Sequence, residues 1–247
     1  MNISLAAEPI GFIGALPVTN TLIMAIGVSA LLTLLALVTR RQIALVPTPG
    51  VGHAVEAVID GLLGFVDSVT HDRERSVRFL PYVATIFLFV IASNWIELLP
   101  GLGTIGVVEE HGGESVIVPF IRSASADLNV TIAVALFSVG VTQIVGMRAL
   151  GAAGHWKKFF NFSNPIFTFV GLLELVSESS KIVSFSFRLF GNIFAGEVLL
   201  LVVSSLAPYI VPLPFLLLEL FVGFIQALVF SMLTLVNLNM AVARSEH

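Results

Sequence analysis

Cysteine is absent from this 247-residue chain, and charged residues make up only 11% of it. Without cysteine there is no disulfide, no thiolate metal site and no thiol nucleophile. The shortage of charge excludes an ordinary water-soluble domain, in which roughly a quarter of the residues are charged. The chain is instead rich in hydrophobic residues, at 57%, and its mean hydropathy is +1.01. These values predict an integral membrane protein.

A block of polar composition large enough for a separate soluble domain is also missing, so residues 1–247 are expected to form a single membrane domain. The sequence lacks a glycine-rich loop that would hold phosphates. Its five histidines are spread along the sequence, and this spacing does not indicate a metal site. We therefore expect this chain to bind no nucleotide, cofactor or nucleic acid.

The membrane spans can be read from windows of about 20 apolar residues, the length that crosses a hydrocarbon core of about 30 Å. Five segments have the required length and composition: residues 21–38, 79–99, 127–147, 165–206 and 215–240. No basic residue precedes the first segment, which therefore indicates a retained helix rather than a signal peptide. The predicted fold class is an all-α membrane protein with about five membrane helices.

One further helix is expected between the first two spans. Residues 54–70 place Glu56, Asp60 and Asp67 on one helical face and apolar side chains largely on the others. This pattern predicts an amphipathic helix lying at the cytoplasmic membrane interface.

The distribution of basic residues predicts the orientation. Most of them lie between the first two spans, after the third span or at the C-terminus: Arg40, Arg41, Arg73, Arg75, Arg78, Arg148, Lys157, Lys158 and Arg244. Because cytoplasmic loops carry an excess of lysine and arginine, the N-terminus is expected outside and the C-terminus in the cytoplasm. This orientation requires an odd number of crossings.

The segment 165–206 allows two interpretations. As one helix of about 42 residues it would be about 63 Å long, twice the hydrocarbon thickness, and would have to cross at a steep tilt. A hairpin broken at residues 177–181 would leave a first arm of about 15 residues, which is short for a span, and would make the number of crossings even. We therefore expect one long tilted helix, and a bulky neighbour that imposes its angle.

Polar side chains follow regular faces of the last two helices. At about 100° per residue, one stripe of the first helix contains Glu174, Ser177, Lys181, Ser184, Arg188 and Asn192. Glu197 projects to the opposite side, and Glu219 and Gln226 share one face of the last helix. An antiparallel hairpin about the turn at 207–214 would bring Glu219 opposite Glu197 and Gln226 near Asn192. The two carboxylates are then expected to share an outer pocket.

Arg188 is the most unusual residue of the chain, because ionisable side chains inside membrane segments cost several kcal/mol and are functional by default. An ion pair with Glu174 or Glu178 within the same helix is excluded by their separation along it. Arginine stays protonated at physiological pH, so Arg188 is suited to act as a fixed charge rather than as a proton relay.

These residues stand in recognisable motifs. "FRLFGNIFAGE", preceded by "LELVSESSKIVS" and followed by Glu219 and Gln226, resembles the subunit a family of F-type ATP synthases. The resemblance extends from "NWIELLPG" to the C-terminus, whereas the first hundred residues match mainly in layout. It implies a rotary motor's membrane stator beside a ring of c subunits, against which the last two helices lie steeply tilted. Further implied partners are the b subunits of the peripheral stalk, the rest of the F1Fo complex and the lipid bilayer.

The resemblance also implies roles for individual residues. Arg188 would be the essential arginine that faces the c-ring and separates two offset aqueous half-channels. The proton pathway would include Glu197, Glu219, Asn192 and Gln226, with the inner access formed by Glu174, Ser177 and Ser184. Some bacterial members carry histidine at the position of Glu219. The implied activity is proton translocation coupled to ring rotation in a bacterial plasma (inner) membrane, with ATP formed elsewhere in the complex, so that the chain is not an enzyme on its own.

Two other classes of function fit less well. A self-contained channel or secondary transporter could use Arg188 to bind an anionic substrate, but such proteins commonly contain internal repeats, and no second copy of the Arg188 segment is found. A passive membrane scaffold leaves the aligned polar stripes unexplained. The choice between H⁺ and Na⁺ belongs largely to residues of the ring.

Overall fold

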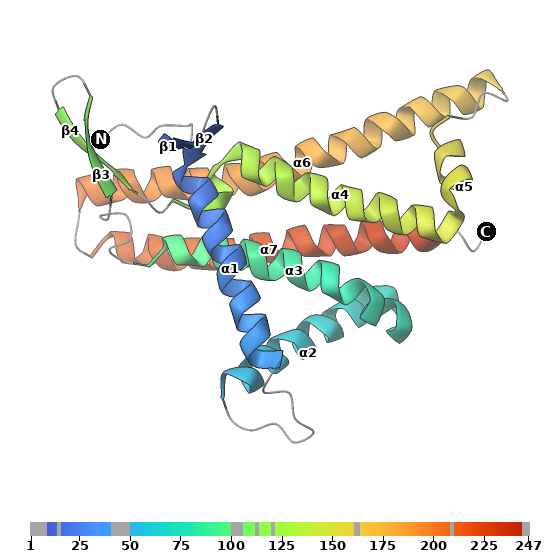
Figure 1. Cartoon of the computed structure of the whole chain (residues 1–247), viewed down its shortest axis with the longest axis horizontal. Helices are drawn as coiled ribbons and strands as arrows, with labels where there is room; N and C mark the ends of the chain where they lie inside the picture. Colours follow the sequence, from blue (N-terminus) through green and yellow to red (C-terminus); the bar gives the residue numbers. More distant parts are fainter. Residues whose placement is uncertain are drawn as a thin grey trace. The chain divides into compact units, whose positions relative to one another are not determined.

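The computed structural model describes residues 9–13, 16–40, 50–99, 106–111, 114–119, 122–160, 164–207 and 210–243. The α-helices in these ranges are α1 (Asn20–Arg40), α2 (Val51–Thr70), α3 (Arg73–Glu97), α4 (Leu128–Leu150), α5 (Ala152–Lys157), α6 (Pro165–Leu206) and α7 (Pro212–Ala243) (Figure 1). Among the described residues, five helices are long and apolar enough to cross a membrane, namely α1, α3, α4, α6 and α7. The predicted all-α membrane fold is therefore confirmed.

The segment 165–206 forms one uninterrupted helix, α6, without a break at residues 177–181. Pro165 stands at its first position, where proline has no amide hydrogen bond to lose, and no proline follows inside the helix. Helix α7 begins in the same way at Pro212, with Pro214 still in the first turn. The predicted interfacial helix at 54–70 lies within α2. It ends at His71, whose φ of 53° is left-handed and whose amide donates to the carbonyl of Asp67 at 3.0 Å.

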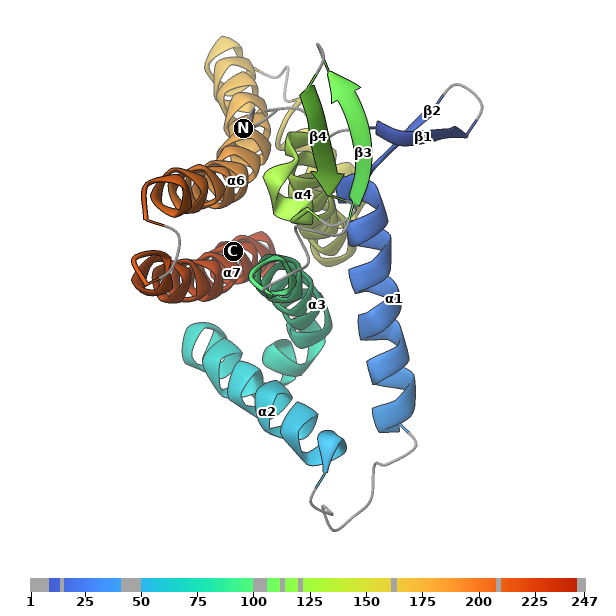
Figure 2. The same ribbon diagram turned by 90° about the vertical axis from the view of Figure 1, so that its left-hand side faces the viewer.

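Two short hairpins accompany the helices, and the sequence pattern did not predict them. β1 (Pro9–Ile13) pairs with β2 (Leu16–Thr19), and β3 (Gly106–His111) pairs with β4 (Glu114–Pro119), both in antiparallel register (Figure 2). The valine and isoleucine residues of β3 and β4 favour extended backbone, which explains why this segment pairs as strands.

Contacts along the chain divide it into two compact units. Unit 1 consists of Met1–Arg41, Leu88–Thr131 and Phe187–Leu228, and unit 2 of Gln42–Phe87, Ile132–Ser186 and Val229–His247. Helices α3, α4, α6 and α7 thus contribute residues to both. The single-domain interpretation stays a prediction.

Unit 1 is held together by a small apolar core and by hydrogen bonds between helices. The core contains Met24 and Val28 of α1, with Ala124 from the short 3₁₀ helix η2 (Ala124–Ala126). Asp127 accepts hydrogen bonds from the Thr21 hydroxyl at 2.7 Å and from the amide of Asn129 at 2.8 Å. Asp127 therefore caps the start of α4 and ties it to α1.

In unit 1, α3 is also fastened to α7. The indole N–H of Trp95 donates to the carbonyl of Leu220 at 3.1 Å, and the Asn94 amide donates to the carbonyl of Gly223 at 3.3 Å. Because both acceptors are main-chain groups one turn apart on α7, the end of α3 is held in a defined position along that helix.

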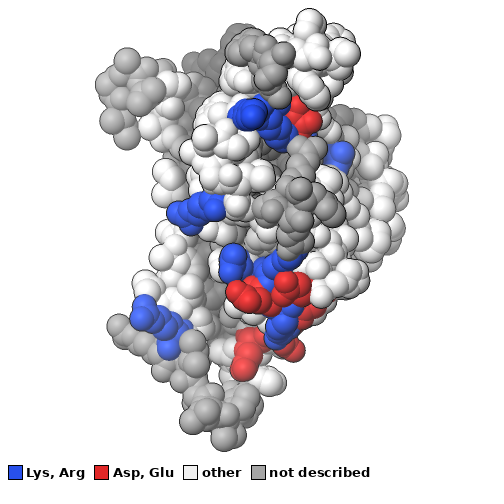
Figure 3. Space-filling view, turned by 90° about the vertical axis from the view of Figure 1, so that its right-hand side faces the viewer, with Lys and Arg blue, Asp and Glu red and all other residues white. Residues whose placement is uncertain are grey.

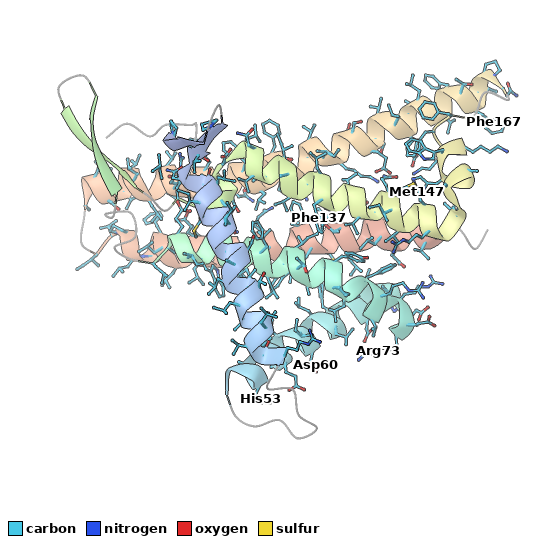
Figure 4. The ribbon with its side chains drawn as sticks, in the orientation of Figure 1. His53, Asp60, Arg73, Phe137, Met147 and Phe167 are labelled. Atoms are coloured by element: carbon cyan, nitrogen blue, oxygen red, sulfur yellow. The ribbon has the colours of Figure 1, made fainter. Side chains whose placement is uncertain are left out.

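Unit 2 has its own core, in which Val66 of α2 packs with residues of α3, α4 and α7: Phe79, Val83, Val141, Leu235 and Leu238. A hydrogen bond of 2.7 Å joins the hydroxyls of Ser138 and Thr234 inside the unit. Many apolar side chains point away from the core instead, and Phe137 of α4 and Phe167 of α6 are 48% and 54% exposed (Figure 4). Such an apolar exterior suits a helix surrounded by lipid or by a partner in the membrane.

Charged side chains are few and grouped. On the face drawn in Figure 3, acidic and basic side chains lie together in places, other basic side chains stand alone, and most of the remaining described surface is uncharged. Near the start of α3, Arg73 pairs with Asp67, Arg75 with Asp72 at 3.0 Å, and Arg78 with Glu74 at 3.0 Å. These partly or fully exposed pairs lie between α2 and the apolar part of α3, as expected for residues at a membrane surface.

Candidate functional site

Unit 1 contains a pocket with three carboxyl groups, which we call the carboxylate pocket. Glu97 at the end of α3, Glu197 on α6 and Glu219 on α7 line a cavity of about 350 Å³ together with five leucines. The antiparallel register of α6 and α7 brings the last two glutamates into the same cavity. The sequence predicted that Glu197 and Glu219 lie close together, but it did not predict that Glu97 lies with them.

Arg122 supplies the cation of this pocket. Its guanidinium nitrogen Nη2 donates to Oε2 of Glu197 at 2.9 Å, and only 5% of the residue is exposed. Three acidic side chains therefore line a cavity whose remaining walls are apolar, and one basic side chain pairs with one of them. Charges in such surroundings interact more strongly than they do in water.

A glycine allows Glu219 to approach α6 so closely. A Cβ atom placed on Gly196 would lie 2.9 Å from Cδ of Glu219, which is too close for an ordinary contact. Gly196 immediately precedes Glu197, so the small residue and the acidic residue together shape one wall of the pocket.

Two further predicted polar residues, Asn192 and Gln226, contact each other on the N-terminal side of Glu197 in α6. The side-chain amide of Asn192 donates to Oε1 of Gln226 at 2.6 Å. Gln226 is buried, with 3% of its surface exposed, whereas Asn192 is exposed. This contact and the carboxylate pocket follow the same antiparallel register.

Arg188 lies on the opposite side of α6 from the residues that pack inward. Leu189 and Ile193 are buried, at 1% and 3% exposure, whereas Arg188, Gly191 and Ala195 are exposed. Among the described residues, no ion pair involves Arg188. Because Gly191 and Ala195 are small, the surface beside the guanidinium is open to the close approach of another chain.

Unit 2 contains a second polar group, which we call the lysine–glutamate cluster. Lys158, just after α5, places its ammonium nitrogen 2.6 Å from Oε1 of Glu174 and 3.5 Å from Oε1 of Glu178. Lys181 approaches the same oxygen of Glu178 at 3.0 Å. The lysines and glutamates line a cavity of about 60 Å³ with residues of α4 and α7. Two cations and two anions balance each other here.

Gln143 of α4 connects this cluster to a buried histidine. Its amide nitrogen donates to Oε2 of Glu178 at 2.9 Å, and its oxygen lies 2.7 Å from Nε2 of His155. An amide oxygen can only accept, so Nε2 of His155 carries the proton in this arrangement. Burial lowers the pKa of His155 from its ordinary value of 6.5, and the charge of Lys158 lowers it further, while Glu178 opposes the shift. The neutral imidazole is thus favoured.

The remaining predicted residues are spread along α6. Glu174 belongs to the lysine–glutamate cluster, whereas Ser177 and Ser184 are exposed on the helix surface. The sequence did not predict five polar residues of these two sites. Glu97 lines the carboxylate pocket and Arg122 pairs with Glu197, whereas Gln143, His155 and Lys158 line the second cavity. Two of these residues could have been singled out from the sequence. Glu97 lies in the "NWIELLPG" motif, and Arg122 is the one lysine or arginine in an acidic stretch.

Known proteins match this chain over most of its length. The pattern of the family described as the ATP synthase A chain matches residues 21–239. ATP synthase subunit a of Campylobacter fetus subsp. fetus is 33% identical over 227 residues, which cover 92% of each chain. The protein of the same name from Mycobacterium ulcerans is 32% identical over 234 residues, covering 93% of this chain and 89% of the relative.

A relative with lower sequence identity matches a similar share of the chain. ATP synthase subunit a of Moorella thermoacetica is 29% identical over 223 residues, which cover 90% of both chains. The matched region contains all five membrane-spanning helices, apart from the outermost residues of α1 and α7. The chain therefore belongs to the ATP synthase A chain family, whose members are non-catalytic membrane subunits in the Fo sector of the ATP synthase complex.

Proposed function

We propose that this chain translocates protons as the stator beside a ring of c subunits, and that Arg188 separates two half-channels that open to opposite sides of the membrane. The carboxylate pocket would belong to the outer half-channel and the lysine–glutamate cluster to the inner one. Glu197, Glu219, Asn192 and Gln226 would then serve the outer path, and Glu174, Ser177 and Ser184 the inner access. Ion flow through these paths would turn the ring.

The exposed face around Arg188 is the observation that carries this proposal. A permanent cation in a membrane helix, without an ion pair among the described residues and flanked by Gly191 and Ala195, is well suited to meet a carboxylate on another chain. A nearby positive charge favours the ionised form of such a carboxylate. The ring carboxylate would release its proton beside Arg188 into one half-channel and take up another from the second.

Arg188 would also prevent a direct leak. A proton moving straight between the half-channels would have to pass the guanidinium, which repels it and cannot relay it at physiological pH. Moving one elementary charge across 100 mV releases about 2.3 kcal/mol, so several protons per revolution are needed to drive ATP formation.

The proposed setting follows from the basic residues that flank the spans. The positive-inside rule places the N-terminus outside and the C-terminus in the cytoplasm of a bacterial inner membrane. Both termini lie outside the described residues. The c-ring would contact the exposed face of α6, and the b subunits of the peripheral stalk would hold this chain in place within the F1Fo complex.

The direct test is Arg188→Ala in the complete ATP synthase. Inverted membrane vesicles that contain the assembled complex are assayed for ATP-driven proton pumping and for passive proton permeability. We expect pumping to fall to background and permeability to rise, because the fixed charge between the half-channels is gone. Arg78→Ala, which removes an exposed arginine paired with Glu74, is the matched control and should pump normally.

Normal pumping by an assembled Arg188→Ala complex would refute the separation of half-channels by this residue. A self-contained transporter is the alternative, and it predicts ion flux through the purified chain alone in liposomes. The stator proposal predicts no such flux, because the ring carboxylates that carry the proton between half-channels would be missing.

A further inference from the structure

Arg122 lies outside a regular helix, but hydrogen bonds fix the backbone next to it. The segment that carries it runs into η2, and the Ser123 hydroxyl donates to the carbonyl of Ser93 at 3.3 Å while accepting from the amide of Ser125 at 3.2 Å. Ser123 and Ala124 are completely buried. The backbone next to Arg122 is therefore fixed to α3 independently of the arginine side chain.

The guanidinium of Arg122 forms an ion pair with Glu197. Its nitrogen Nη2 lies 2.9 Å from Oε2 of Glu197, and both groups belong to unit 1 although they are 75 residues apart in the sequence. A buried guanidinium must be paired, because removing it from water without a counter-charge is costly. The pairing makes Glu197 different from Glu219, although both line the same cavity.

Glu219 has different surroundings. Its carboxylate packs against Gly196, and its Oε2 atom is buried without a hydrogen-bond partner among the described residues. Of the two glutamates that α6 and α7 contribute, Glu219 is thus the one to which a proton can be added without breaking the ion pair with Arg122.

We propose that Arg122 is a positioning residue for proton transfer: it holds Glu197 as a fixed anion and leaves Glu219 as the proton-carrying group of the carboxylate pocket. This inference rests on the proposed function of the pocket. A proton from water would bind Glu219 and later leave to a carboxylate of the ring, so that Glu219 returns to its starting form. The paired Glu197 would not trap the proton on its way.

The first test reads the protonation state without measuring transport. Dicyclohexylcarbodiimide reacts with protonated carboxyl groups in apolar surroundings, and mass spectrometry of peptides from this chain locates the product. In the unaltered complex in native membranes we expect modification at Glu219 and none at Glu197. In Arg122→Gln we expect modification at Glu197 as well, because its fixed cation is lost. Equal modification of both glutamates in the unaltered complex would overturn the proposal.

The second test asks whether Arg122 acts through Glu197. Proton pumping per assembled complex is compared for Arg122→Gln, Arg122→Lys, Glu197→Gln and the double variant Arg122→Gln/Glu197→Gln. We expect Arg122→Gln to lower pumping at least about tenfold, because it leaves a buried carboxylate without its partner. Arg122→Lys should retain most of the pumping, and the double variant should pump no less than Glu197→Gln alone. Arg73→Gln, which removes an exposed arginine of an ion pair in unit 2, is the control for loss of one positive charge.

A role of Arg122 as a simple structural clamp gives other results. Lysine would then fail to rescue, the double variant would be worse than either single variant, and the pattern of modification would stay unchanged in Arg122→Gln; each of these outcomes overturns the proposal. If Arg122→Gln does not assemble, the modification of the unaltered complex decides. Normal pumping by Arg188→Ala would refute the half-channel proposal, but it would not change the expected difference between Glu197 and Glu219.

Discussion

The two polar groups of this chain differ in their balance of charge. The carboxylate pocket of unit 1 sets three glutamates against one arginine around about 350 Å³ of space, whereas the lysine–glutamate cluster of unit 2 sets two lysines against two glutamates around about 60 Å³. A pocket with excess carboxylates has a strong tendency to take up protons. A balanced cluster can keep all its charges. This difference agrees with the proposed roles, in which the first group takes up protons and the second belongs to the inner access.

In a comparison of the two groups, the largest effect is expected from the removal of Glu219, the proposed proton-carrying group of unit 1. Glu219→Gln keeps the shape of the side chain but cannot take up a proton, so ATP-driven pumping by assembled complexes should fall at least about tenfold. Glu219→His restores a titratable group and should recover much of the pumping. Equal pumping by the glutamine and histidine variants would show that Glu219 does not act by taking up a proton. The proposed difference in proton uptake between the two polar groups would then be wrong.

A smaller effect is expected when the balance in unit 2 is disturbed. Lys158→Gln leaves Glu174 and Glu178 with Lys181 as the remaining lysine of the cluster and also removes the ammonium that lies 4.9 Å from the centre of the Phe159 ring. Because these side chains are partly exposed to solvent, we expect a loss of about 1 kcal/mol in stability. The measurement is the temperature at which half of the chain dissociates from the detergent-solubilised complex.

The matched variants for that measurement are Lys158→Arg and the double variant Lys158→Gln/Glu174→Gln. Both keep the number of positive and negative charges equal and should dissociate close to the temperature of the unaltered complex. If Lys158→Gln is as stable as these variants, charge balance is not what holds the cluster together.

The smallest expected effect is a pH dependence that comes from His155. Its folded-state pKa is below the ordinary 6.5, so between these two values the unfolded chain binds more protons than the folded chain. The stability of unit 2 should therefore fall as the pH decreases below 6.5 and level off below the folded-state pKa. His155→Gln should remove this part of the pH dependence of the dissociation temperature. His53→Gln, which changes an exposed histidine of α2, should leave it in place.

An identical pH dependence in His155→Gln and in the unaltered complex would contradict this assignment. The pH dependence of stability could then not be assigned to the histidine beside the lysine–glutamate cluster. The carboxylate pocket contains no histidine among its lining residues, so the same variant is not expected to alter it.

Much of the fold could be predicted from composition and periodicity. The apolar windows located all five membrane-spanning helices, and the absence of internal proline indicated that α6 is continuous over 165–206. The hairpin register also placed Glu219 near Glu197 and Gln226 near Asn192, because positions on two consecutive antiparallel helices are related by simple counting from the turn. The roles of these residues remain predictions.

The rest of the two cavities could not be predicted in this way. Glu97, Arg122 and His155 come from segments distant in sequence from the helices they contact, and helical periodicity relates only residues on the same helix. The pairing of Arg122 with Glu197 depends on the fixed path of the chain from Ser123 into α4. No pattern within that short segment predicts that Arg122 will pair with Glu197.

The sequence by itself determined the membrane class, the number and length of the spans, the family and the permanent charge at Arg188, because hydropathy, helical length and side-chain chemistry are local properties. Only the tertiary structure decided which charges lie together. It brought Arg122 to Glu197, left Glu219 against Gly196, and joined His155 through Gln143 to Glu178. Ion pairs and hydrogen bonds act over a few ångströms, so which groups interact depends on how distant segments pack.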